Sequence, residues 1–333
     1  DPPSIDQATA GWQELNGNWR AAVNSTARMK SALNLPNARK FVIAAGLLAA
    51  AMPAWGGAQI QKTLKLDPGG RFVLEADEGS VDLVGSDQTG ASVVVTSYRD
   101  DLQKEVDLSF DEDAGMVRVR ERRRYWNPLD FLFDPLGLHF EIRVPKSTTL
   151  EIKTGGGAIK IDSIVGYAEL KTSGGSIEMS NLIGDVHANT SGGNIEAQQI
   201  RGEIEVGTSG GSIEADSIDG GLTADTSGGE IRIDGVTGRV RAHTSGGSIS
   251  ATLNKGNAKG GDLDTSGGSI YVRLDPTVNL NVDASSSGGG VRYGLPLRRV
   301  DSSSWDAVRG TLGSGGDLLR VHTSGGSVML DPL

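Results

Sequence analysis

The sequence predicts an all-β fold, a single-stranded parallel β-helix (β-solenoid) with about 18 residues per rung. Three observations lead to this prediction. Threonines recur every 18 residues at positions 154, 172, 190, 208, 226 and 244, and most of them open a Thr-Ser-Gly-Gly motif. Apolar or small residues alternate with polar ones beside each motif, as in strands with one buried face. No repeat contains a helix-length segment, so equivalent strands are expected to stack in parallel.

Each repeat reads as two strands separated by two corners. The first strand ends on the threonine, and the Ser-Gly-Gly corner follows, where glycine tolerates the positive φ that a tight turn often requires. The second strand carries an inward isoleucine, at positions 177, 195, 213, 231 and 249. The threonines share the parity of the inward aliphatic residues, so they are expected to face inward and to hydrogen-bond one another. The right-handed form is preferred because of crossover chirality.

The first 58 residues are excluded from this fold. Residues 1–28 read as an upstream extension or a long n-region, and residues 29–58 as a signal peptide. Basic residues precede the apolar run 41–52, and Pro53 and small residues follow it, which is typical of a signal peptide cleaved after Ala58. A membrane span would need about 20 apolar residues. The protein is therefore expected to be exported to the periplasm, the cell surface or the medium.

The remaining chain divides into an irregular and a regular part. Residues 59–150 alternate without a strict period, so they are expected to form irregular first rungs or an N-terminal cap. Residues 151–333 form the regular solenoid, interrupted at 295–318 before one final rung.

Composition excludes several classes of function. The chain has no cysteine, which excludes disulfides, thiolate metal sites and a catalytic thiol. Its formal net charge is −10, and no broad basic surface suggests a nucleic-acid partner. Glycine is abundant, at 48 residues, and aromatic residues make up only 5%, which fits a thin repetitive core rather than a deep globular one.

The titratable residues give no enzyme, metal or cofactor site. Asp162, Asp216 and Asp234 share one corner position, but the corners are too short to build the cleft that a polysaccharide-active enzyme needs. His187 and His243 lie three rungs apart and cannot share a metal. The repeated glutamates at 178, 196 and 214 are read as a solvated face, with a cation-binding or partner-binding stripe as the alternative. The protein is therefore predicted to have no catalytic residue, no bound metal and no cofactor.

The segment 118–140 is the least repetitive part of the chain and concentrates arginine with aromatic residues. Three readings remain open: a cap over the end of the solenoid, a docking surface for a partner, or a contact with an anionic membrane. The candidate docking residues are Arg122, Arg123, Arg124, Tyr125, Trp126, Phe131, Phe133 and Phe140.

The opening EGSVDLVGSD, the run of TSGGSIE rungs and the closing GLPL…GTLGSGGDLLRVHTSGGSVML together resemble the DUF4097 family over roughly residues 65–331. The resemblance implies an extracytoplasmic β-solenoid, adhesin-like, with no assigned catalytic residues. The expected function is a non-catalytic binding module whose partner is an unknown envelope protein or polysaccharide. The alternative is a self-assembling envelope protein that forms filaments through the ends of the solenoid.

Overall fold

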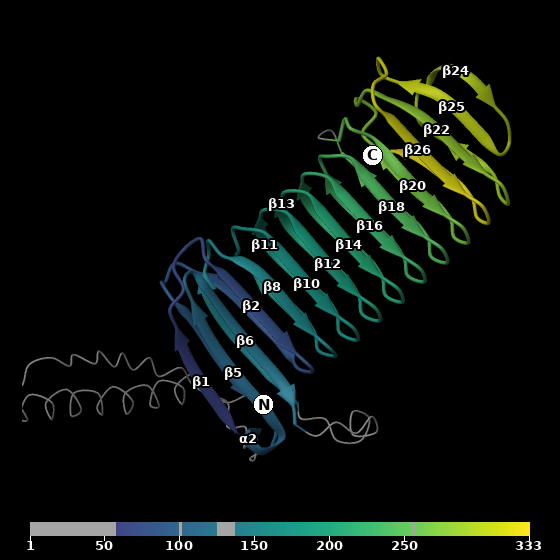
Figure 1. Ribbon diagram of the computed structural model, residues 1–333. Helices are drawn as coiled ribbons and strands as arrows, with labels where there is room; N and C mark the ends of the chain where they lie inside the picture. Colours follow the sequence, from purple (N-terminus) through teal and green to yellow (C-terminus); the bar gives the residue numbers. More distant parts are fainter. Residues whose placement is uncertain (1–57, 100–101, 125–136, 255–256) are drawn as a thin grey trace, which may run out of the picture. The chain divides into compact units, whose positions relative to one another are not determined.

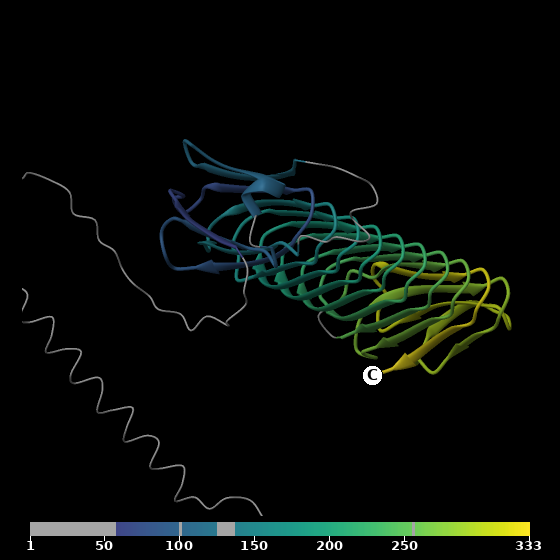
Figure 2. The ribbon, with the colours of Figure 1, turned by 90° about the horizontal axis from the view of Figure 1, so that it is seen from below.

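The computed structural model describes residues 58–333, except 100–101, 125–136 and 255–256. These residues form two long β-sheets that face each other and enclose one continuous core of aliphatic side chains (Figures 1 and 2). A one-turn helix, α2 (Leu102–Glu105), precedes one of the edge strands. The all-β solenoid predicted from the repeat is confirmed.

The two sheets are named A and B, and their strands follow in spatial order. Sheet A contains β1 (Gln59–Leu64), β4 (Ala91–Thr96), β7 (His139–Pro145), β3 (Ser80–Ser86), β9 (Ile159–Asp162), β11 (Ile177–Ile183), β13 (Ile195–Arg201), β15 (Ile213–Asp219), β17 (Ile231–Val236), β19 (Ile249–Leu253), β21 (Ile270–Leu274), β27 (Val328–Pro332) and β23 (Val291–Tyr293). Sheet B contains β24 (Arg298–Ser303), β25 (Ala307–Leu312), β22 (Leu280–Ser286), β26 (Leu318–Thr323), β20 (Gly261–Thr265), β18 (Val240–Thr244), β16 (Leu222–Thr226), β14 (Ile204–Thr208), β12 (Val186–Thr190), β10 (Ala168–Thr172), β8 (Thr149–Thr154), β2 (Arg71–Ala76), β6 (Met116–Arg123) and β5 (Val106–Asp113).

In the regular part, one strand of each sheet makes up a rung. Equivalent residues pair in parallel at an offset of 18, as in Ile195 with Ile177 on one side and Ile213 on the other. The five repeat isoleucines are at most 1% exposed and form one inward ladder, as predicted. The neighbouring column of Lys160, Glu178 and the glutamates that follow points outward, on a half-buried or exposed face. The right-handed sense remains a prediction.

The threonines hold consecutive rungs together at one corner. Thr172 is buried, and its hydroxyl donates to the carbonyl oxygen of Gly157 in the preceding rung (2.8 Å) and accepts from the amide of Gly175 in its own rung (3.4 Å). The same pair of contacts recurs at Thr190, Thr208, Thr226, Thr244, Thr265 and Thr323. The prediction that these hydroxyls face inward is confirmed. The prediction that they bond one another is wrong, because backbone groups of the glycine corner are their partners.

The second glycine of each Ser-Gly-Gly corner is required by close packing between rungs. A Cβ atom on Gly175 would lie 2.0 Å from the carbonyl oxygen of Gly157, and one on Gly193 would lie 2.1 Å from that of Gly175. These glycines do not have positive φ, so the reason expected from the sequence does not apply here. Positive φ belongs instead to the closing glycines at the opposite corner, such as Gly184 (φ 137°).

The N-terminal end is built in an order that differs from the sequence. The first rung, β2 with β3, lies between the rung of β6 and β7 and the rung of β8 and β9, so Phe72 pairs with both Val117 and Leu150. The outermost rung is then covered by antiparallel strands: β5 pairs with β6, and β4 with β7. This end therefore contains rungs out of sequence order together with antiparallel strands that cover them.

The rungs at the C-terminal end are also out of sequence order. The last rung of the sequence, β26 with β27, lies between the rung of β20 and β21 and the rung of β22 and β23. Thr323 therefore bonds the corner of the preceding spatial rung at Gly268, and Ser286 bonds the corner of the last rung at Gly326 (2.6 Å). The final TSGG rung of the sequence is therefore not the outermost rung in space. Antiparallel β25 and β24, from the interruption 295–318, cover this end of sheet B.

Candidate binding groove

In five consecutive rungs, sheet A has a residue in the left-handed conformation near the end of the strand, and the chain bends there. Ser163, Asn181, Gln199 and Ser217 have φ between 53° and 61°, and Gly235 continues the column at 70°. A non-glycine residue in this conformation costs roughly 1–2 kcal/mol. The bend is repeated at the same place in consecutive rungs, so it produces a hollow that runs along the solenoid rather than an isolated dent.

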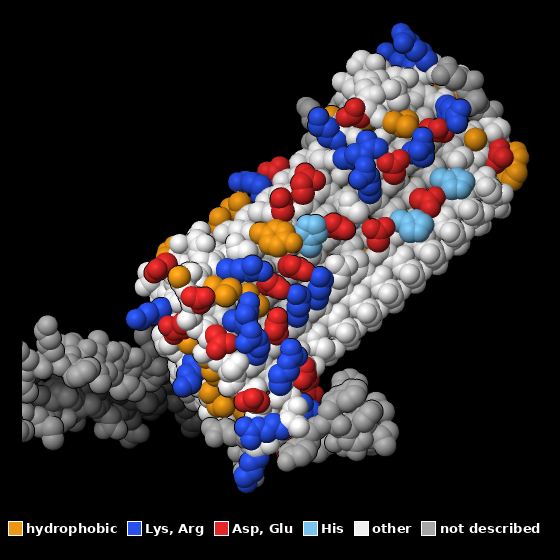
Figure 3. All heavy atoms as spheres, in the orientation of Figure 1, with side chains coloured by type: hydrophobic (Ala, Val, Ile, Leu, Met, Phe, Trp, Pro, Cys, Tyr) orange, Lys and Arg blue, Asp and Glu red, His pale blue; other side chains and the backbone are white. Residues whose placement is uncertain are grey.

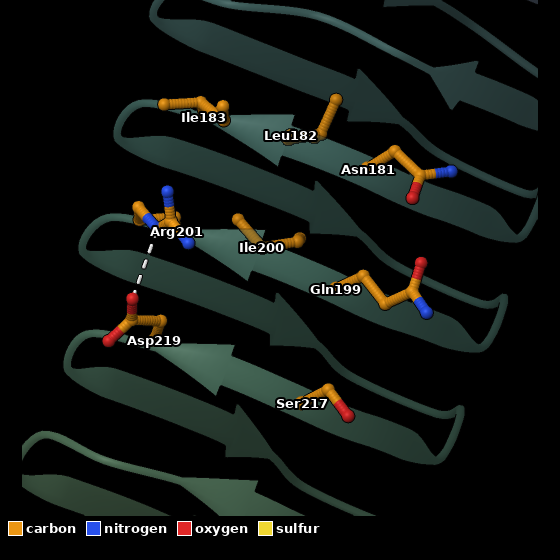
Figure 4. Close-up of a pocket in the computed structure, with 8 residues that line it drawn as sticks. All are labelled: Asn181, Leu182, Ile183, Gln199, Ile200, Arg201, Ser217 and Asp219. Atoms are coloured by element: carbon orange, nitrogen blue, oxygen red, sulfur yellow. Dashed lines mark hydrogen bonds and ion pairs between the residues drawn. The ribbon is translucent and has the colours of Figure 1, made fainter.

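This hollow is a groove of about 380 Å³ over three rungs (Figure 4). The polar side chains of Asn181, Gln199 and Ser217 line one side, and the buried Leu182 and Ile200 form the floor. The opposite rim carries Ile183, Arg201 and Asp219 in successive rungs. The lining therefore combines neutral hydrogen-bonding groups, an apolar floor and one charged pair.

Hydrogen bonds to Asp162 hold the polar side of the groove in place at one end. Asp162 accepts hydrogen bonds from Ser163, Ser180 and Asn181, each at 2.7 Å. Partial burial works to raise the pKa of Asp162, but the hydrogen bonds from Asn181, Ser163 and Ser180 together hold that pKa below its usual value. The bond to Asp162 orients the Asn181 amide. Gln199, in the next rung, makes no side-chain hydrogen bond to any residue that the structure describes.

The charged pair on the far rim is exposed. Arg201 Nε lies 3.0 Å from Asp219 Oδ2, and both side chains are more than half exposed. An exposed ion pair of this kind contributes at most about 1 kcal/mol to stability. Its main effect is to leave this part of the groove with no net charge.

Backbone groups at the groove are already used between rungs. The amide of Ile183 donates to the carbonyl of Ile164 (2.8 Å), and the amide of Gly184 donates to that of Arg201 (2.8 Å). A partner in the groove therefore cannot extend the sheet, and it would be recognised by side chains.

The aspartates considered as catalytic candidates lie beside the groove, in register. The column runs from Asp162 through Ser180 and Gln198 to Asp216 and Asp234. Asp216 is half-buried and Asp234 is exposed on the open face of sheet A. They share one position as predicted, but that position lies within the strands of sheet A and not at a corner.

Two of the histidines, His187 and His243, pair with carboxylates on the outer face of sheet B, the face seen in Figure 3. His187 Nδ1 lies 3.1 Å from Glu205 Oε2, and His243 Nδ1 lies 3.1 Å from Asp264 Oδ2. Within the described parts of the chain, no three metal-ligating side chains come together. Along one edge of the same view, the Ser-Gly-Gly corners form a band without charged or hydrophobic side chains.

Of the predicted docking residues, Phe140 and three arginines lie within the described residues. Phe140 is completely buried in β7 and therefore cannot contact a partner. Arg122 is exposed and pairs with Asp77 (2.6 Å), whereas the Arg123 side chain is only 9% exposed and lies 3.8 Å from Glu78.

The segment 118–140 lies partly outside the residues that the structure describes. Arg124 donates its backbone amide to the carbonyl of Glu105 (2.9 Å). Tyr125, Trp126, Phe131 and Phe133 lie outside the described residues, so docking through them remains a prediction. The segment 118–140 is also not wholly an insertion, because its first residues belong to β6 and its last to β7.

The groove residues were not identified from the sequence, although a signal exists. The buried aliphatic residue at this point of the rung lies two positions before a glycine, as Leu182 does before Gly184. The residue just before it is Ser, Asn, Gln, Ser and Gly in successive rungs. Asn and Gly favour the left-handed conformation, so this column could have indicated the bend.

Within the described residues, no helix is both long and apolar enough to cross a membrane.

Comparison with known proteins identifies one family of similar sequences. The profile of the Toastrack DUF4097 family matches residues 80–331. Among curated proteins, none matches the chain.

Similar solved structures include three bacterial proteins. A candidate adhesin from Bacteroides fragilis is 10% identical, with 83% of this chain and 97% of that chain covered and a TM-score of 0.40. A candidate lipid binding protein from Parabacteroides distasonis is 13% identical (84% and 98% covered, TM-score 0.32), and a candidate cell adhesion protein from Clostridium sporogenes is 9% identical (83% and 100% covered, TM-score 0.26). The family profile spans most of the chain, including its regular rungs, its groove and its C-terminal interruption, and the chain therefore belongs to the DUF4097 family.

Proposed function

We propose that this protein is an exported, non-catalytic binding module that holds an extended partner along the axis of its solenoid. The observation that carries the proposal is the column of left-handed residues in sheet A, because it repeats one bend in consecutive rungs. The groove side chains are consequently presented at the spacing of the strands, about 4.8 Å. A partner with its own short repeat can contact several rungs at once, which multiplies weak contacts.

The surroundings of the groove favour binding over catalysis. Glycoside hydrolysis uses two carboxyl groups that flank the scissile bond in a site shielded from water. Asp216 and Asp234 lie instead on the open face of sheet A, beside a shallow groove. These carboxylates are better suited to setting the charge of the face than to acid–base chemistry.

The localisation of the protein is part of the same proposal. The signal-peptide pattern at 29–58, of which residues 29–57 lie outside the described residues, directs export to the periplasm, the surface or the medium. The partner is then an envelope polysaccharide or an envelope protein. The filament alternative has less support, because antiparallel strands are added outside the terminal rungs at both ends.

The test uses a variant that removes the groove amides without disturbing the bend. In Asn181→Gly/Gln199→Gly, glycine suits the left-handed conformation, as Gly235 does in the same column. The matched control is Asn189→Gly, which removes an amide from sheet B of the same rung, in a column that already contains Gly207. The measurement is co-sedimentation of the purified protein with cell envelopes.

We expect saturable retention of the parent and the control, and retention reduced about tenfold or more in the groove variant, as the loss of two hydrogen-bonding side chains allows. Equal retention of the groove variant and the control would contradict the proposal.

A further inference from the structure

Three of the polar side chains that line the groove are neutral, and each of these can both donate and accept hydrogen bonds. The Asn181 and Gln199 amides and the Ser217 hydroxyl have this property. Asn181 is held by Asp162, Ser217 donates to Asp216 (3.0 Å), and Gln199 has no side-chain partner among the described residues. A ligand with many hydroxyl groups offers the matching mixture of donors and acceptors.

The apolar surface that a ligand can reach lies at one end of the rim. Leu182 and Ile200 lie beneath the floor and are at most 2% exposed, whereas Ile183, where the rim begins, is 46% exposed. Ile183 pairs in parallel with Val165 of the preceding rung, and Val165 is 44% exposed. Adjacent exposed aliphatic side chains of this kind are typical of a binding surface rather than of a solvated face. Such aliphatic side chains suit the C–H faces of sugar rings, and the hydroxyl groups around each ring remain free to meet the polar side of the groove.

The charge of the face selects among such ligands. Glu178, Glu196 and Glu214 form a column on the same sheet, which Lys160 and Arg232 continue at its two ends. Lys160 pairs with Glu178 (2.8 Å), so the excess negative charge comes from the other two glutamates and from the aspartates at 216 and 234 in the next column. The arginine of the groove is already paired with Asp219. Carboxylated or phosphorylated polymers are repelled by this arrangement, whereas a neutral polymer is not.

The direction and period of the groove exclude an extended peptide strand as the natural ligand. The groove runs across the strands, and its backbone amides and carbonyls are bonded between rungs, so strand addition is impossible. A linear hexose polymer instead advances by close to one strand spacing per sugar. Successive sugars can then meet the equivalent side chains of successive rungs.

We infer that the groove lined by Asn181, Gln199 and Arg201 binds a neutral linear glycan, laid along the solenoid with about one sugar per rung. The inference rests on the proposed function and names the ligand class of the same site. Several sugars bound in register give a useful total affinity although each sugar contributes little.

The experiment is isothermal titration calorimetry of the purified protein with three neutral hexasaccharides: a β-(1→4)-glucan, a β-(1→4)-mannan and an N-acetylated β-(1→4)-glucosamine oligomer. A galacturonic acid oligomer of equal length is the charged comparison. We expect at least one neutral hexamer to bind, with an affinity that is insensitive to salt because no ion pair is formed with the ligand. We expect the galacturonic acid oligomer to bind about tenfold more weakly or not at all.

The variants decide where the glycan binds. Asn181→Gly/Gln199→Gly should weaken binding about tenfold or more, and Asn189→Gly should leave it unchanged. Circular dichroism and melting of each variant establish that the solenoid is intact. Failure of all three neutral hexamers to bind, or equal binding by the groove variant and the control, would overturn the inference. Envelope retention that still depended on the groove amides in that case would keep the proposed function and assign the groove to another class of partner.

Discussion

Glu121 is a buried carboxyl group at a position where the regular rungs have threonine. It aligns with Ala76, which in turn aligns with Thr154. Its Oε2 accepts from the backbone amides of Asp77 (2.8 Å) and Glu78 (3.3 Å), so it supplies the acceptor that Ala76 lacks. Its Oε1 has no hydrogen-bond partner among the described residues. The side chain thus closes a corner at the cost of burying an ionisable group.

The environment of Glu121 makes its charge unfavourable. Burial raises its pKa from an ordinary 4.5 to about 7, although the amides of Asp77 and Glu78 act to lower it and the carboxylates of the same two residues raise it further. The folded protein therefore holds this proton more tightly than the unfolded chain between pH 4.5 and about 7. Stability from this group is present below pH 4.5 and falls as the pH rises to about 7.

We predict that Glu121→Gln raises the free energy of unfolding at pH 8 by up to about 3 kcal/mol, since each pKa unit corresponds to about 1.4 kcal/mol. At pH 4 the variant and the parent should have nearly equal stability, because the parent carboxyl is then neutral in both states. Urea denaturation at the two pH values measures the difference. Glu178→Gln, on the exposed face, is the control, and a difference between pH 4 and pH 8 that is the same in all three proteins would contradict the assignment.

At the scale of elements, the threonine corner is the repeated joint between rungs. Thr208 links Gly193 of the preceding rung to Gly211 of its own rung through one hydroxyl (2.9 and 3.3 Å). Both backbone groups lie beside a buried side chain, where water cannot easily replace a lost partner.

We predict that Thr208→Val lowers the free energy of unfolding by about 1–3 kcal/mol, because it keeps the shape of the side chain but leaves a buried donor and acceptor unpaired. Ser209→Ala, at the exposed next position, should change stability by less than about 0.5 kcal/mol. Chemical denaturation of both variants tests this. A loss at Ser209 equal to that at Thr208 would show that the corner is held by something other than the buried hydroxyl.

At the scale of the whole solenoid, both ends are interlocked. The first rung in sequence is second in space at one end, and the last rung in sequence is next to last at the other. The outer edges are the antiparallel strands β1, β5 and β24 and the parallel strand β23. Two of these edges are clearly unsuited to pairing, because β5 carries Asp107, Asp111, Glu112 and Asp113, and β23 is only three residues long. Charged and short edge strands are common protection against edge-to-edge association.

We therefore predict that the purified protein is a monomer. Size-exclusion chromatography and negative-stain microscopy should give single particles at every concentration tested, and the elution volume should not change with salt. Filaments or a concentration-dependent ladder of oligomers would instead support the self-assembling alternative.

The period of the sequence was sufficient to predict the interior of the solenoid. Ile213 and Glu214 are neighbours with opposite surroundings, and the alternation alone placed the first inside and the second outside. It placed Thr208 inside as well but not its partners, because hydrogen-bond partners at a corner depend on how far one rung lies from the next. The bend at Asn181 and Gln199, and with it the groove, escaped prediction because it depends on φ at single residues of weak preference.

The sequence by itself determined the fold class, the parallel stacking and which face of each strand is buried, since these follow from a repeat that gives every rung the same alternation. Only the tertiary structure decided the order of the terminal rungs. Phe72 packs between Val117 and Leu150, and a strand with the same inward aliphatic pattern could pair equally well with several others. The neighbour of a terminal strand is chosen by its connecting loops and by antiparallel strands from distant segments, and no local pattern encodes that choice.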